Sequence, residues 1–428
     1  MKVAIYTLGC KMNQYETQAM EQLLRQRGHE VVEFTDAADV YVVNTCSVTA
    51  VSDQKSRKVL HRVRRERPGA VLAVCGCYPQ THAEEVRGLD VDLIAGTGDR
   101  KGFVALLEES VRERRLVESI DRSFDRRSFE VLPAGGMENR TRAMLKIEDG
   151  CVNFCSYCII PYARGPVRSA FLETAVAQAR QLAREGYREI VLTGIEISSW
   201  GQDLKKGQTL IDLLEAVAAA VPEVRLRLGS LEPRTITEAF CRRASALPNL
   251  CPQFHLSMQS GCDATLRRMN RKYDTARYLE SVELLRRWFS RPAITTDMIV
   301  GFPEETEEEF AATLDFIAVC GFAQMHIFPY SIRPGTPAAK MEQVSAAVKE
   351  DRVRRAAEAA AGMHRAYLAG CVGRRYSVLF EQPRGDLFFG HAPNYMEVLA
   401  SGSGLHNAVK TVRVTGTDGQ SLLGEIEE

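Results

Sequence analysis

Long hydrophobic runs are absent from this chain of 428 residues, and neither sign of charge prevails. No stretch approaches the ~20 apolar residues that cross a bilayer. The first residues, Met1–Tyr6, turn polar too soon for a signal peptide and predict a β-strand instead. The 55 Lys and Arg balance the 55 Asp and Glu, which excludes a globally basic nucleic-acid binder. We therefore expect a cytoplasmic protein without a membrane partner, in which any RNA-binding surface is local.

Cysteine is the residue that the sequence has in unusual number. Twelve cysteines occur in a chain whose 45% hydrophobic and 26% charged residues are otherwise ordinary for a globular protein. A reducing cytosol disfavours disulfides, and seven of the twelve lie before residue 160. The clustering indicates metal ligation, in a protein whose length predicts two or three domains of ~150 residues.

Residues 1–118 alternate short apolar runs with helical patterns. The predicted strands are Val3–Thr7, Val40–Asn44, Val71–Val74 and Asp92–Ala95, and the predicted helices are Glu16–Arg27, Gln54–Glu66 and Lys101–Arg114. This alternation is typical of a parallel sheet flanked by helices, as in a Rossmann-like or flavodoxin-like α/β domain. Residues 119–137 are rich in Arg, Asp, Ser, Pro and Gly and are predicted to form a linker.

Two further domains are predicted after this linker. In residues 138–366 the predicted strands are Ala143–Ile147, Glu189–Thr193, Val224–Leu228, Gln253–Leu256, Ala293–Val300 and Ala323–Phe328. The helices between and after them are Glu173–Glu185, Leu210–Ala220, Glu307–Val319 and a long helix Ala346–Tyr367. Six βα units cannot close an eight-stranded barrel, so we expect an open, partial (βα)6 barrel. Residues 367–428 carry the short strands Tyr376–Phe380, Met396–Leu399, Val409–Val414 and Leu422–Ile426, which predict a small antiparallel β-barrel.

Three cysteines follow the first strand of the second domain. Cys151, Cys155 and Cys158 are spaced C-x3-C-x2-C in a loop with turn residues. Thiolates are soft ligands that hold iron–sulfur clusters, and three of them leave one iron of a four-iron cube open. A zinc site is the alternative, but zinc sites usually show paired C-x2-C units or histidines, and no histidine lies near this motif.

This motif, with the aromatic Tyr157 before the third cysteine, resembles the radical S-adenosylmethionine (SAM) enzymes. The resemblance implies a [4Fe-4S] cluster whose open iron binds SAM, which is then cleaved to methionine and a 5′-deoxyadenosyl radical. The implied SAM contacts are Tyr157 and residues at the C-terminal ends of strands, namely Gly194, Glu196, Gln259, Val300 and Gly301. Each match alone is weak, since a glycine after a strand is often only a turn.

Three more cysteines follow predicted strands of the first domain. Cys10, Cys46 and Cys77 lie where strands end, and the ends of parallel strands share one edge of a sheet. The three thiolates converge there if the strand order allows it. The alternative is that they are buried apolar cysteines, and Cys75 competes with Cys77 for the third place.

The segments around these cysteines resemble those of methylthiotransferases. G-C-x-x-N-Q, N-T-C-x-V-T and G-C-x-x-Q occur in that order ahead of the radical SAM motif, and the resemblance covers almost the whole chain, with a terminal barrel of the TRAM type. It implies that Cys10, Cys46 and Cys77, with Cys75 as the alternative to Cys77, hold a second [4Fe-4S] cluster. The other cysteines match no motif and are expected to be structural: Cys241, Cys251, Cys262, Cys320 and Cys371.

The same resemblance implies the reaction. One SAM methylates a sulfur held at the second cluster, and another SAM yields the radical that abstracts hydrogen from the substrate carbon. A sulfur donor and an electron donor such as flavodoxin or ferredoxin are implied as partners. No catalytic acid or base can be named from the sequence.

The segments Gly9–Gln14, Thr45–Thr49 and His326–Thr336 most resemble the subgroup that acts at C2 of N6-threonylcarbamoyladenosine, at position 37 in the tRNA anticodon loop. The alternatives are isopentenyl-adenosine at position 37, an aspartate of a ribosomal protein, and a non-catalytic iron–sulfur RNA-binding protein. A fourth alternative, a redox protein using Cys75 and Cys77, lacks the usual C-x-x-C spacing.

Local basic residues fit an RNA substrate. The candidate phosphate contacts are Lys55, Arg57, Lys58, Arg62, Arg64 and Arg65, together with Arg374 and Arg375 in the terminal domain. A solvated helix face explains the first group equally well. Residues 371–428 carry five Lys and Arg against seven Asp and Glu, so that barrel is a poor general phosphate binder. Its aromatic residues are candidates for base stacking, although a place in the barrel core is simpler: Phe388, Phe389 and Tyr395.

Overall fold

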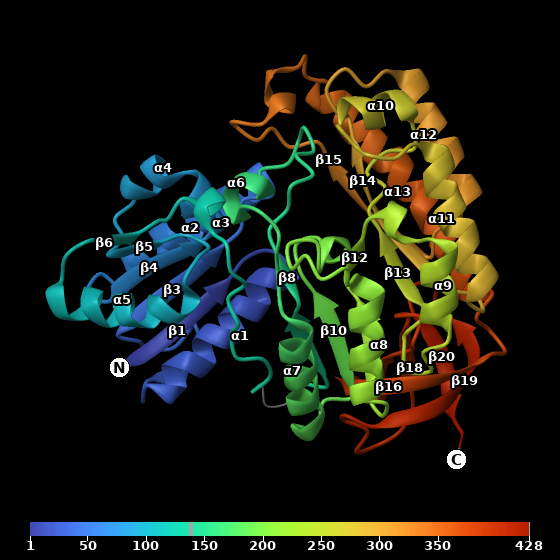
Figure 1. The fold of residues 1–428 in the computed structure, drawn as a ribbon, viewed down its shortest axis with the longest axis horizontal. Helices are drawn as coiled ribbons and strands as arrows, with labels where there is room; N and C mark the ends of the chain where they lie inside the picture. The colour runs from blue at the N-terminus through green and yellow to red at the C-terminus, as the bar shows by residue number, and fades with distance from the viewer. Residues whose placement is uncertain (137–139, 428) are drawn as a thin grey trace.

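The computed structural model describes residues 1–136 and 140–427. Three residues at the predicted boundary between linker and second domain, 137–139, and the C-terminal Glu428 therefore lie outside the described residues. An N-terminal α/β domain, a central domain of parallel strands and a C-terminal β-barrel follow one another along the chain (Figure 1). No helix in the described ranges is both long and apolar enough to cross a membrane.

The N-terminal domain is a six-stranded parallel sheet in the order β2-β1-β3-β4-β5-β6. Its strands are β1 (Lys2–Thr7), β2 (Glu30–Val32), β3 (Val40–Thr45), β4 (Val71–Gly76), β5 (Leu93–Ala95) and β6 (Val117–Ser119). Its helices are α1 (Lys11–Gln26), α2 (Ala50–Glu66), α3 (Cys77–Thr81), α4 (Ala83–Arg87) and α5 (Arg100–Glu113). Side chains of α1 and α5 pack on one face of the sheet and those of α2 on the other, which confirms the predicted α/β class.

The predicted linker is packed rather than free. It contains a short 3-10 helix η1 (Ser123–Asp125), and Ser123 Oγ donates to the carbonyl of Tyr162 at 2.7 Å. Arg126 donates to Asp121 Oδ2 and to Thr97 Oγ1, both at 2.7 Å. The linker therefore bonds to both of the domains that it joins.

The central domain has six main strands, all parallel: β7 (Arg142–Lys146), β10 (Glu189–Thr193), β11 (Arg225–Leu228), β13 (Gln253–Leu256), β14 (Ala293–Val300) and β15 (Gln324–Pro329). Hydrogen bonds group them as β11-β10-β7 and, with the short β12 (Ser230–Leu231), as β12-β13-β14-β15. No pairing of β15 with β7 closes the ring in the described part of the chain. The open arrangement of six βα units is the one predicted.

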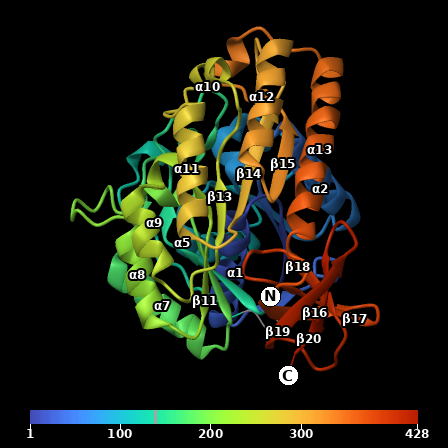
Figure 2. The ribbon, with the colours of Figure 1, turned by 90° about the vertical axis from the view of Figure 1, so that its right-hand side faces the viewer.

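Helices cover the outside of these strands, as Figure 2 shows for β13 to β15. They are α7 (Leu172–Arg184), α8 (Leu210–Ala220), α9 (Glu238–Ser245), α10 (Asp263–Arg268), α11 (Thr275–Trp288), α12 (Glu307–Cys320) and α13 (Ala346–Ala369). The connections include the short strands β8 (Glu148–Asp149) and β9 (Arg168–Ser169), helix α6 (Ile160–Arg164) and the 3-10 turns η2 (Ile197–Ser199), η3 (Pro233–Thr235) and η4 (Pro337–Lys340). Helix α13 continues past residue 366, where the sequence predicted a domain boundary.

The C-terminal domain is a closed barrel in the order β16-β17-β18-β20-β19. Its strands are β16 (Arg375–Arg384), β17 (Leu387–His391), β18 (Glu397–Ala400), β19 (Val409–Thr417) and β20 (Leu422–Ile426), of which β17 was not predicted. Arg142 at the start of β7 pairs with Glu381 of this barrel at 3.1 Å. Arg225 at the start of β11 donates to the carbonyl of Ser377 at 2.8 Å. The barrel therefore lies at the N-terminal ends of the central strands, opposite the ends where SAM contacts were predicted (Figure 1).

Candidate active site

Three cysteines meet at one edge of the N-terminal sheet. Cys10 lies between β1 and α1, Cys46 follows β3, and Cys77 begins α3 directly after β4. These three strands are neighbours in the sheet, so their ends share one edge. The chain approaches so closely that a Cβ on Gly9 would lie 2.5 Å from Cys46 Cβ, and Gly9 has a φ of +110°. Burial raises the pKa of the Cys77 thiol to about 12, and Cys46 and Cys10 lie near enough to add to that rise.

Cys75 is not part of this group. It is fully buried in the core beneath the sheet, among residues such as Leu93 and Phe103. Burial raises the pKa of its thiol to about 11, and the charged groups that act on it are Arg100, Glu16 and Arg164. Cys75 and Cys77 therefore face different surroundings although one residue separates them.

The polar residues of the same segments hold the three loops together. Asn13 Nδ2 donates to the carbonyls of Leu8 and Thr45, both at 2.8 Å. Asn44 Nδ2 donates to the carbonyl of Asn13 at 3.0 Å, and Thr45 Oγ1 donates to the carbonyl of Cys75 at 2.6 Å. The asparagines and threonine around Cys10 and Cys46 thus form the frame that brings the thiols together.

The second cysteine group lies in the loop between β8 and α6. The amide of Cys158 donates to the carbonyl of Cys155 at 2.9 Å, which makes a tight turn. Burial raises the pKa of Cys151 and of Cys158 to about 12, and the neighbouring thiols contribute to each rise. Arg271, which the sequence did not single out, donates from Nη1 to Cys155 Sγ at 3.2 Å. Nothing in the local pattern around Arg271 signals this contact, because the two residues lie 116 positions apart.

The predicted SAM contacts all lie near this loop or at the C-terminal ends of strands. Gly194 follows β10, and a Cβ there would lie 2.7 Å from Glu148 Oε2. Glu196 Oε2 accepts from Asn153 Nδ2, inside the cysteine loop, at 3.1 Å. Val300 is fully buried, and its carbonyl accepts from the backbone amide of Tyr330 at 2.9 Å.

The remaining predicted contacts are at β13 and β14. Gln259 has a φ of +68°, and its backbone amide donates to the backbone carbonyl of Asp297 at 2.9 Å. Gly301 has a φ of +62°, and its amide donates to Glu305 Oε2 at 2.7 Å. Tyr157 contacts Phe302 edge-on, with ring centroids 6.4 Å apart.

One cavity lies between the second cysteine group and the segment that follows Cys46. Its volume is about 260 Å³, and Val48 and Thr49, which follow Cys46, line one part of it. Cys158 lines another part, with Tyr157, Ile159 and Ile160. The rest of the lining comes from the C-terminal ends of β14 and β15 and the residues after them and after β13: Gln259, Asp297, Ile299, Phe328, Pro329, Tyr330 and Ser331. Of the predicted SAM contacts, Tyr157 and Gln259 alone line this cavity.

The segment after β15 also holds the Cys46 loop in place. Arg333 Nη1 donates to Asp53 Oδ2 at 2.6 Å and to the carbonyl of Ser47 at 3.0 Å, and both charged groups are buried. The amide of Ala50 donates to Ser331 Oγ at 2.9 Å. The cavity wall is thus built jointly by the N-terminal and central domains.

The predicted RNA contacts on α2 divide into two sets. Arg57 donates to Tyr78 Oη at 3.0 Å and pairs with Glu85, and Arg64 pairs with Asp92 at 2.7 Å. These two guanidiniums are already engaged within the protein. The other residues form one exposed line along the helix: Lys55, Lys58, Arg62 and Arg65.

The terminal-domain candidates lie at the other end of the molecule. Arg374 and Arg375 line a cavity of about 440 Å³ with Arg291, and none of the described residues that line it is acidic. Arg375 also pairs with Glu427 at 2.6 Å. Two of the aromatic candidates support the simpler interpretation, since Phe389 is buried and Phe388 packs against the barrel core. Tyr395 is instead half-buried and lies against the central domain, with its ring 4.5 Å from the Arg227 guanidinium.

The donor chemistry of both cysteine groups fits an iron–sulfur cluster. Each group offers three thiols, and thiolates are the usual protein ligands of such clusters. Within the described residues, no three His, Cys, Asp or Glu side chains are grouped so as to hold a single metal ion.

Comparison with known proteins gives two family matches. Residues 2–96 match "Uncharacterized protein family UPF0004", and residues 145–317 match the "Radical SAM superfamily". Threonylcarbamoyladenosine tRNA methylthiotransferase MtaB of Bacillus subtilis (strain 168) is 39% identical, over 94% of this chain and 90% of the relative. tRNA-2-methylthio-N(6)-dimethylallyladenosine synthase of Symbiobacterium thermophilum is 34% identical, over 100% of this chain and 94% of the relative.

A solved structure shares the fold. The radical SAM methyltransferase TsrM from Kitasatospora setae, with cobalamin and a [4Fe-4S] cluster bound, aligns with a TM-score of 0.57 and 15% identity. The alignment covers 79% of this chain and 77% of that one. Together with the sequence relatives, which match nearly end to end, these findings show that the chain belongs to the radical SAM methylthiotransferase family of enzymes, as an MtaB-type member.

Proposed function

We propose that the protein inserts a methylthio group at C2 of N6-threonylcarbamoyladenosine at position 37 of tRNA. The observation that carries the proposal is the cavity of about 260 Å³ that Cys158 lines together with the segment after Cys46. Val48 and Thr49, which follow Cys46 after Ser47, line one part of it, and Cys158 lines another. A reaction that joins a sulfur from one centre to a carbon activated at another needs a shared space of this kind.

The two cysteine groups are the proposed ligands. Cys151, Cys155 and Cys158 hold the [4Fe-4S] cluster that binds SAM, and Cys10, Cys46 and Cys77 hold a second one. Cys77 is preferred to Cys75 because Cys46 and Cys10 lie near enough to act on the Cys77 thiol, whereas the groups that act on the Cys75 thiol are Arg100, Glu16 and Arg164. When bound, the clusters supply the electron that cleaves one SAM and the sulfur that a second SAM methylates.

The protein's own residues shape the place where these meet. Ile299, Phe328 and Pro329 make much of the cavity wall apolar, which keeps water from a reactive radical. Tyr330 also lines this wall, and its side chain is buried. The target adenosine has to leave its stack to enter.

The choice of modified adenosine rests on two findings. The MtaB relatives reach 39% identity and the dimethylallyladenosine synthases 34%, each over most of the chain. The His326–Thr336 segment, which resembles the threonylcarbamoyladenosine subgroup, supplies Phe328 and Ser331 to the cavity wall. The substrate-side surface is therefore built from the segment on which the resemblance depends.

The proposed RNA contacts are Lys55, Lys58, Arg62 and Arg65 of α2. The helix begins at Ala50, directly after the cavity residues Val48 and Thr49, so this exposed line leads away from the cavity mouth. Flexible exposed cations suit phosphate binding. Arg374 and Arg375 are proposed as a separate, weaker contact. The electron donor, such as flavodoxin or ferredoxin, and the sulfur donor are proposed as external partners.

Nucleoside mass spectrometry of tRNA from a strain lacking the gene tests this function. We expect the 2-methylthio form of N6-threonylcarbamoyladenosine at position 37 to disappear, and to return with the wild-type gene but not with Cys151→Ala. Loss of the methylthio group from isopentenyl-adenosine instead would show that isopentenyl-adenosine is the substrate. An unchanged tRNA, with a methylthio group missing from a ribosomal protein, would overturn the proposal.

A further inference from the structure

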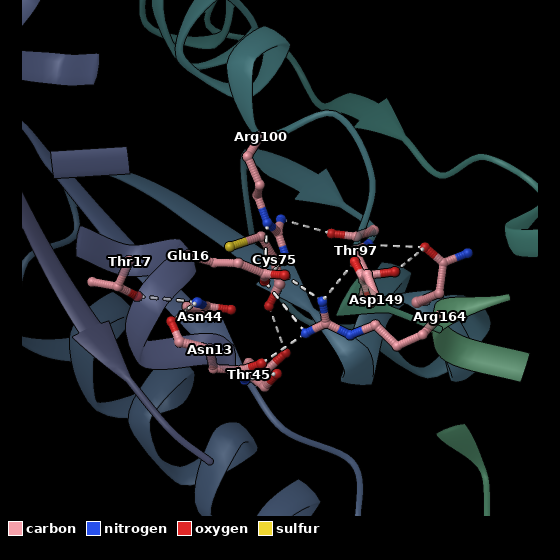
Figure 3. Close-up of polar contacts among 12 residues, drawn as sticks. Asn13, Glu16, Thr17, Asn44, Thr45, Cys75, Thr97, Arg100, Asp149 and Arg164 are labelled. Atoms are coloured by element: carbon pink, nitrogen blue, oxygen red, sulfur yellow. Dashed lines mark hydrogen bonds and ion pairs between the residues drawn. The ribbon is translucent and has the colours of Figure 1, made fainter. Parts of the chain in front are cut away.

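A buried ion-pair network crosses the boundary between the N-terminal and central domains (Figure 3). Arg164 belongs to α6, which begins just after Cys158, and its side chain is fully buried. Its guanidinium donates to the Glu16 carboxylate and, from Nη2 at 3.0 Å, to Asn13 Oδ1. Both partners lie in α1, which begins just after Cys10. One side chain thus ties the element that leaves one cysteine group to the element that leaves the other.

The remaining partners attach the same network to each neighbouring loop. Asp149, just before Cys151, accepts from Lys146 at 2.8 Å and pairs with Arg168 at 3.2 Å and with Arg164 at 3.7 Å. Arg100 of α5 donates to Glu16 Oε2 from Nη2 at 3.0 Å and to the carbonyl of Gly96 at 2.9 Å. Asn13 in turn bonds to Thr45, beside Cys46.

The charges of this network do not balance. The buried carboxylates are Glu16 and Asp149, and the buried cations that pair with them are Arg100, Lys146, Arg164 and Arg168. Two carboxylates therefore face four cations among these buried groups, and Asp149 and Arg168 also line a cavity of about 470 Å³, which Asp121 lines as well. Unpaired buried charge is costly, so a further anion is expected nearby. The N-terminal cysteine group lies at hand, because Asn13 Oδ1 accepts from Arg164 Nη2 at 3.0 Å and Cys10 Sγ lies 4.0 Å from the same oxygen.

We propose that Arg164 is a positioning residue that locks the two cysteine loops at a fixed separation and supplies the positive charge that balances the anionic cluster held by Cys10, Cys46 and Cys77. The inference rests on the proposed function for the presence of that cluster. A cation beside a cluster favours its reduced form, and a fixed separation of the loops keeps radical formation coupled to sulfur transfer.

Three variants separate charge from geometry. Arg164→Met removes both, whereas Arg164→Lys keeps the charge and loses the planar fork that reaches Glu16 and Asn13 together. Arg100→Met is the matched control, because Arg100 is equally buried and binds the same Glu16 but lies within the N-terminal domain, near Cys75. Each protein is purified without oxygen, and its iron content and circular dichroism are compared with those of the wild type.

The first readout is a redox titration followed by electron paramagnetic resonance. In Arg164→Met, at a fixed potential, we expect the ratio of reduced to oxidised second cluster to fall at least tenfold, which equals 59 mV for one electron. The cluster of Cys151, Cys155 and Cys158 should change less. Arg164→Lys and Arg100→Met should stay near the wild-type value. An unshifted second cluster in Arg164→Met, or an equal shift in Arg100→Met, would overturn the assigned charge role.

The second readout is the ratio of 5′-deoxyadenosine released to methylthiolated nucleoside formed. We expect this ratio to rise several-fold in both Arg164 variants and to stay near the wild-type value in Arg100→Met. Equal ratios in all proteins would overturn the positioning role. Wild-type protein that methylthiolates no tRNA would instead refute the proposed function, and the redox titration would still decide the role of Arg164. If Arg164→Met does not fold, Arg164→Lys still tests the positioning role. Soluble Arg164→Lys protein would then show that folding requires a positive charge at this position.

Discussion

Arg271 is the side chain in direct contact with a cysteine sulfur of the central loop. It donates from Nη1 to Cys155 Sγ at 3.2 Å and from Nη2 to the carbonyl of Ser257 at 3.1 Å. Hydrogen bonds to ligand sulfurs raise a cluster's potential. We therefore predict that Arg271→Met lowers the potential of this cluster and slows SAM cleavage by about 10- to 100-fold, measured by redox titration and by 5′-deoxyadenosine release. The control is Arg268→Met, since Arg268 pairs with Glu309 instead, and an unchanged potential in Arg271→Met would refute this role.

Cys75 and Cys77 give opposite predictions. Cys77→Ala should lose roughly half of the iron, since one of two [4Fe-4S] clusters loses a ligand. Cys75→Ala should keep the full iron content and lose about 1 kcal/mol of stability from its buried position. Iron analysis and chemical denaturation of the two variants check this. Iron loss in Cys75→Ala together with full iron in Cys77→Ala would reverse the assignment.

Glu16 provides a pH dependence. Burial acts to raise its pKa, but the guanidiniums of Arg164 and Arg100, helped by Lys146, prevail and lower it to about 2 from the ordinary 4.5. Between these values the unfolded chain takes up the proton first, so the contribution of Glu16 is complete above pH 4.5 and is lost as the pH falls toward 2.

Denaturant unfolding of the apoprotein from pH 7 to pH 3 measures this loss. We expect Glu16→Gln to be less stable at pH 7, by about 3–5 kcal/mol as for other broken buried pairs, and to lose less stability than the wild type on acidification. Glu108→Gln is the control, because Glu108 also has a pKa of about 2 but pairs with Arg27 at the surface, where water screens the interaction. Parallel acid profiles for wild type and Glu16→Gln would contradict the prediction.

Helix α2 was predicted from its local sequence pattern, but its first turn was not. The predicted helix began at Gln54, whereas α2 begins at Ala50 with Thr49 as its cap, whose side chain accepts from the amide of Ser52 at 3.2 Å. Asp53 is buried because Arg333, 280 positions away, pairs with it. Because a buried Asp breaks the apolar pattern that marks a helix face, the first turn of α2 could not be recognised from the sequence.

Strands of different length were predicted with different success. The fully buried strands β3 and β4 were found, because strands covered on both faces carry runs of apolar residues, here residues 40–43 and 71–74. The three-residue strands β2 and β6 at the sheet edges were missed. β17 was also missed, because its five residues include a glycine and show no alternation of apolar and polar side chains. It pairs with β16 around a register shift near Gln382.

The exposed line on α2 gives the prediction for RNA binding. Reversing two charges with Lys58→Glu and Arg62→Glu should weaken tRNA binding without sequence preference and reduce the salt dependence of log Kd by about 2. Binding titrations at several salt concentrations check this. The same change of charge on α5, Lys101→Glu with Arg112→Glu, is the control, because α5 packs on the opposite face of the sheet. Equal losses in both double variants would show a general charge effect and not a binding surface.

Over the whole molecule, the sequence predicted three domains and the meeting of Cys10, Cys46 and Cys77 at one sheet edge. Both predictions follow from the alternation of strand and helix patterns, which is visible in the local sequence and implies a parallel sheet. The contacts that join the domains were not predictable: Glu16 with Arg164, Asp53 with Arg333, and Arg271 with Cys155. Each joins residues more than 100 positions apart, and no local signal shows which two residues pair. The place of the terminal barrel, at the N-terminal ends of the central strands, rests on similar long-range pairs.

One anaerobic turnover experiment decides whether the two cysteine groups act together on a shared substrate. Wild-type protein, a variant with Cys10, Cys46 and Cys77 changed to Ala, and a variant with Cys151, Cys155 and Cys158 changed to Ala are each given SAM, a reductant, a sulfur source and unmodified tRNA. We predict 5′-deoxyadenosine and methylthiolated nucleoside from the wild type, 5′-deoxyadenosine alone from the first variant, and neither product from the second. Methylthiolated nucleoside from the first variant, or from none of the three proteins, would contradict the two-centre reaction.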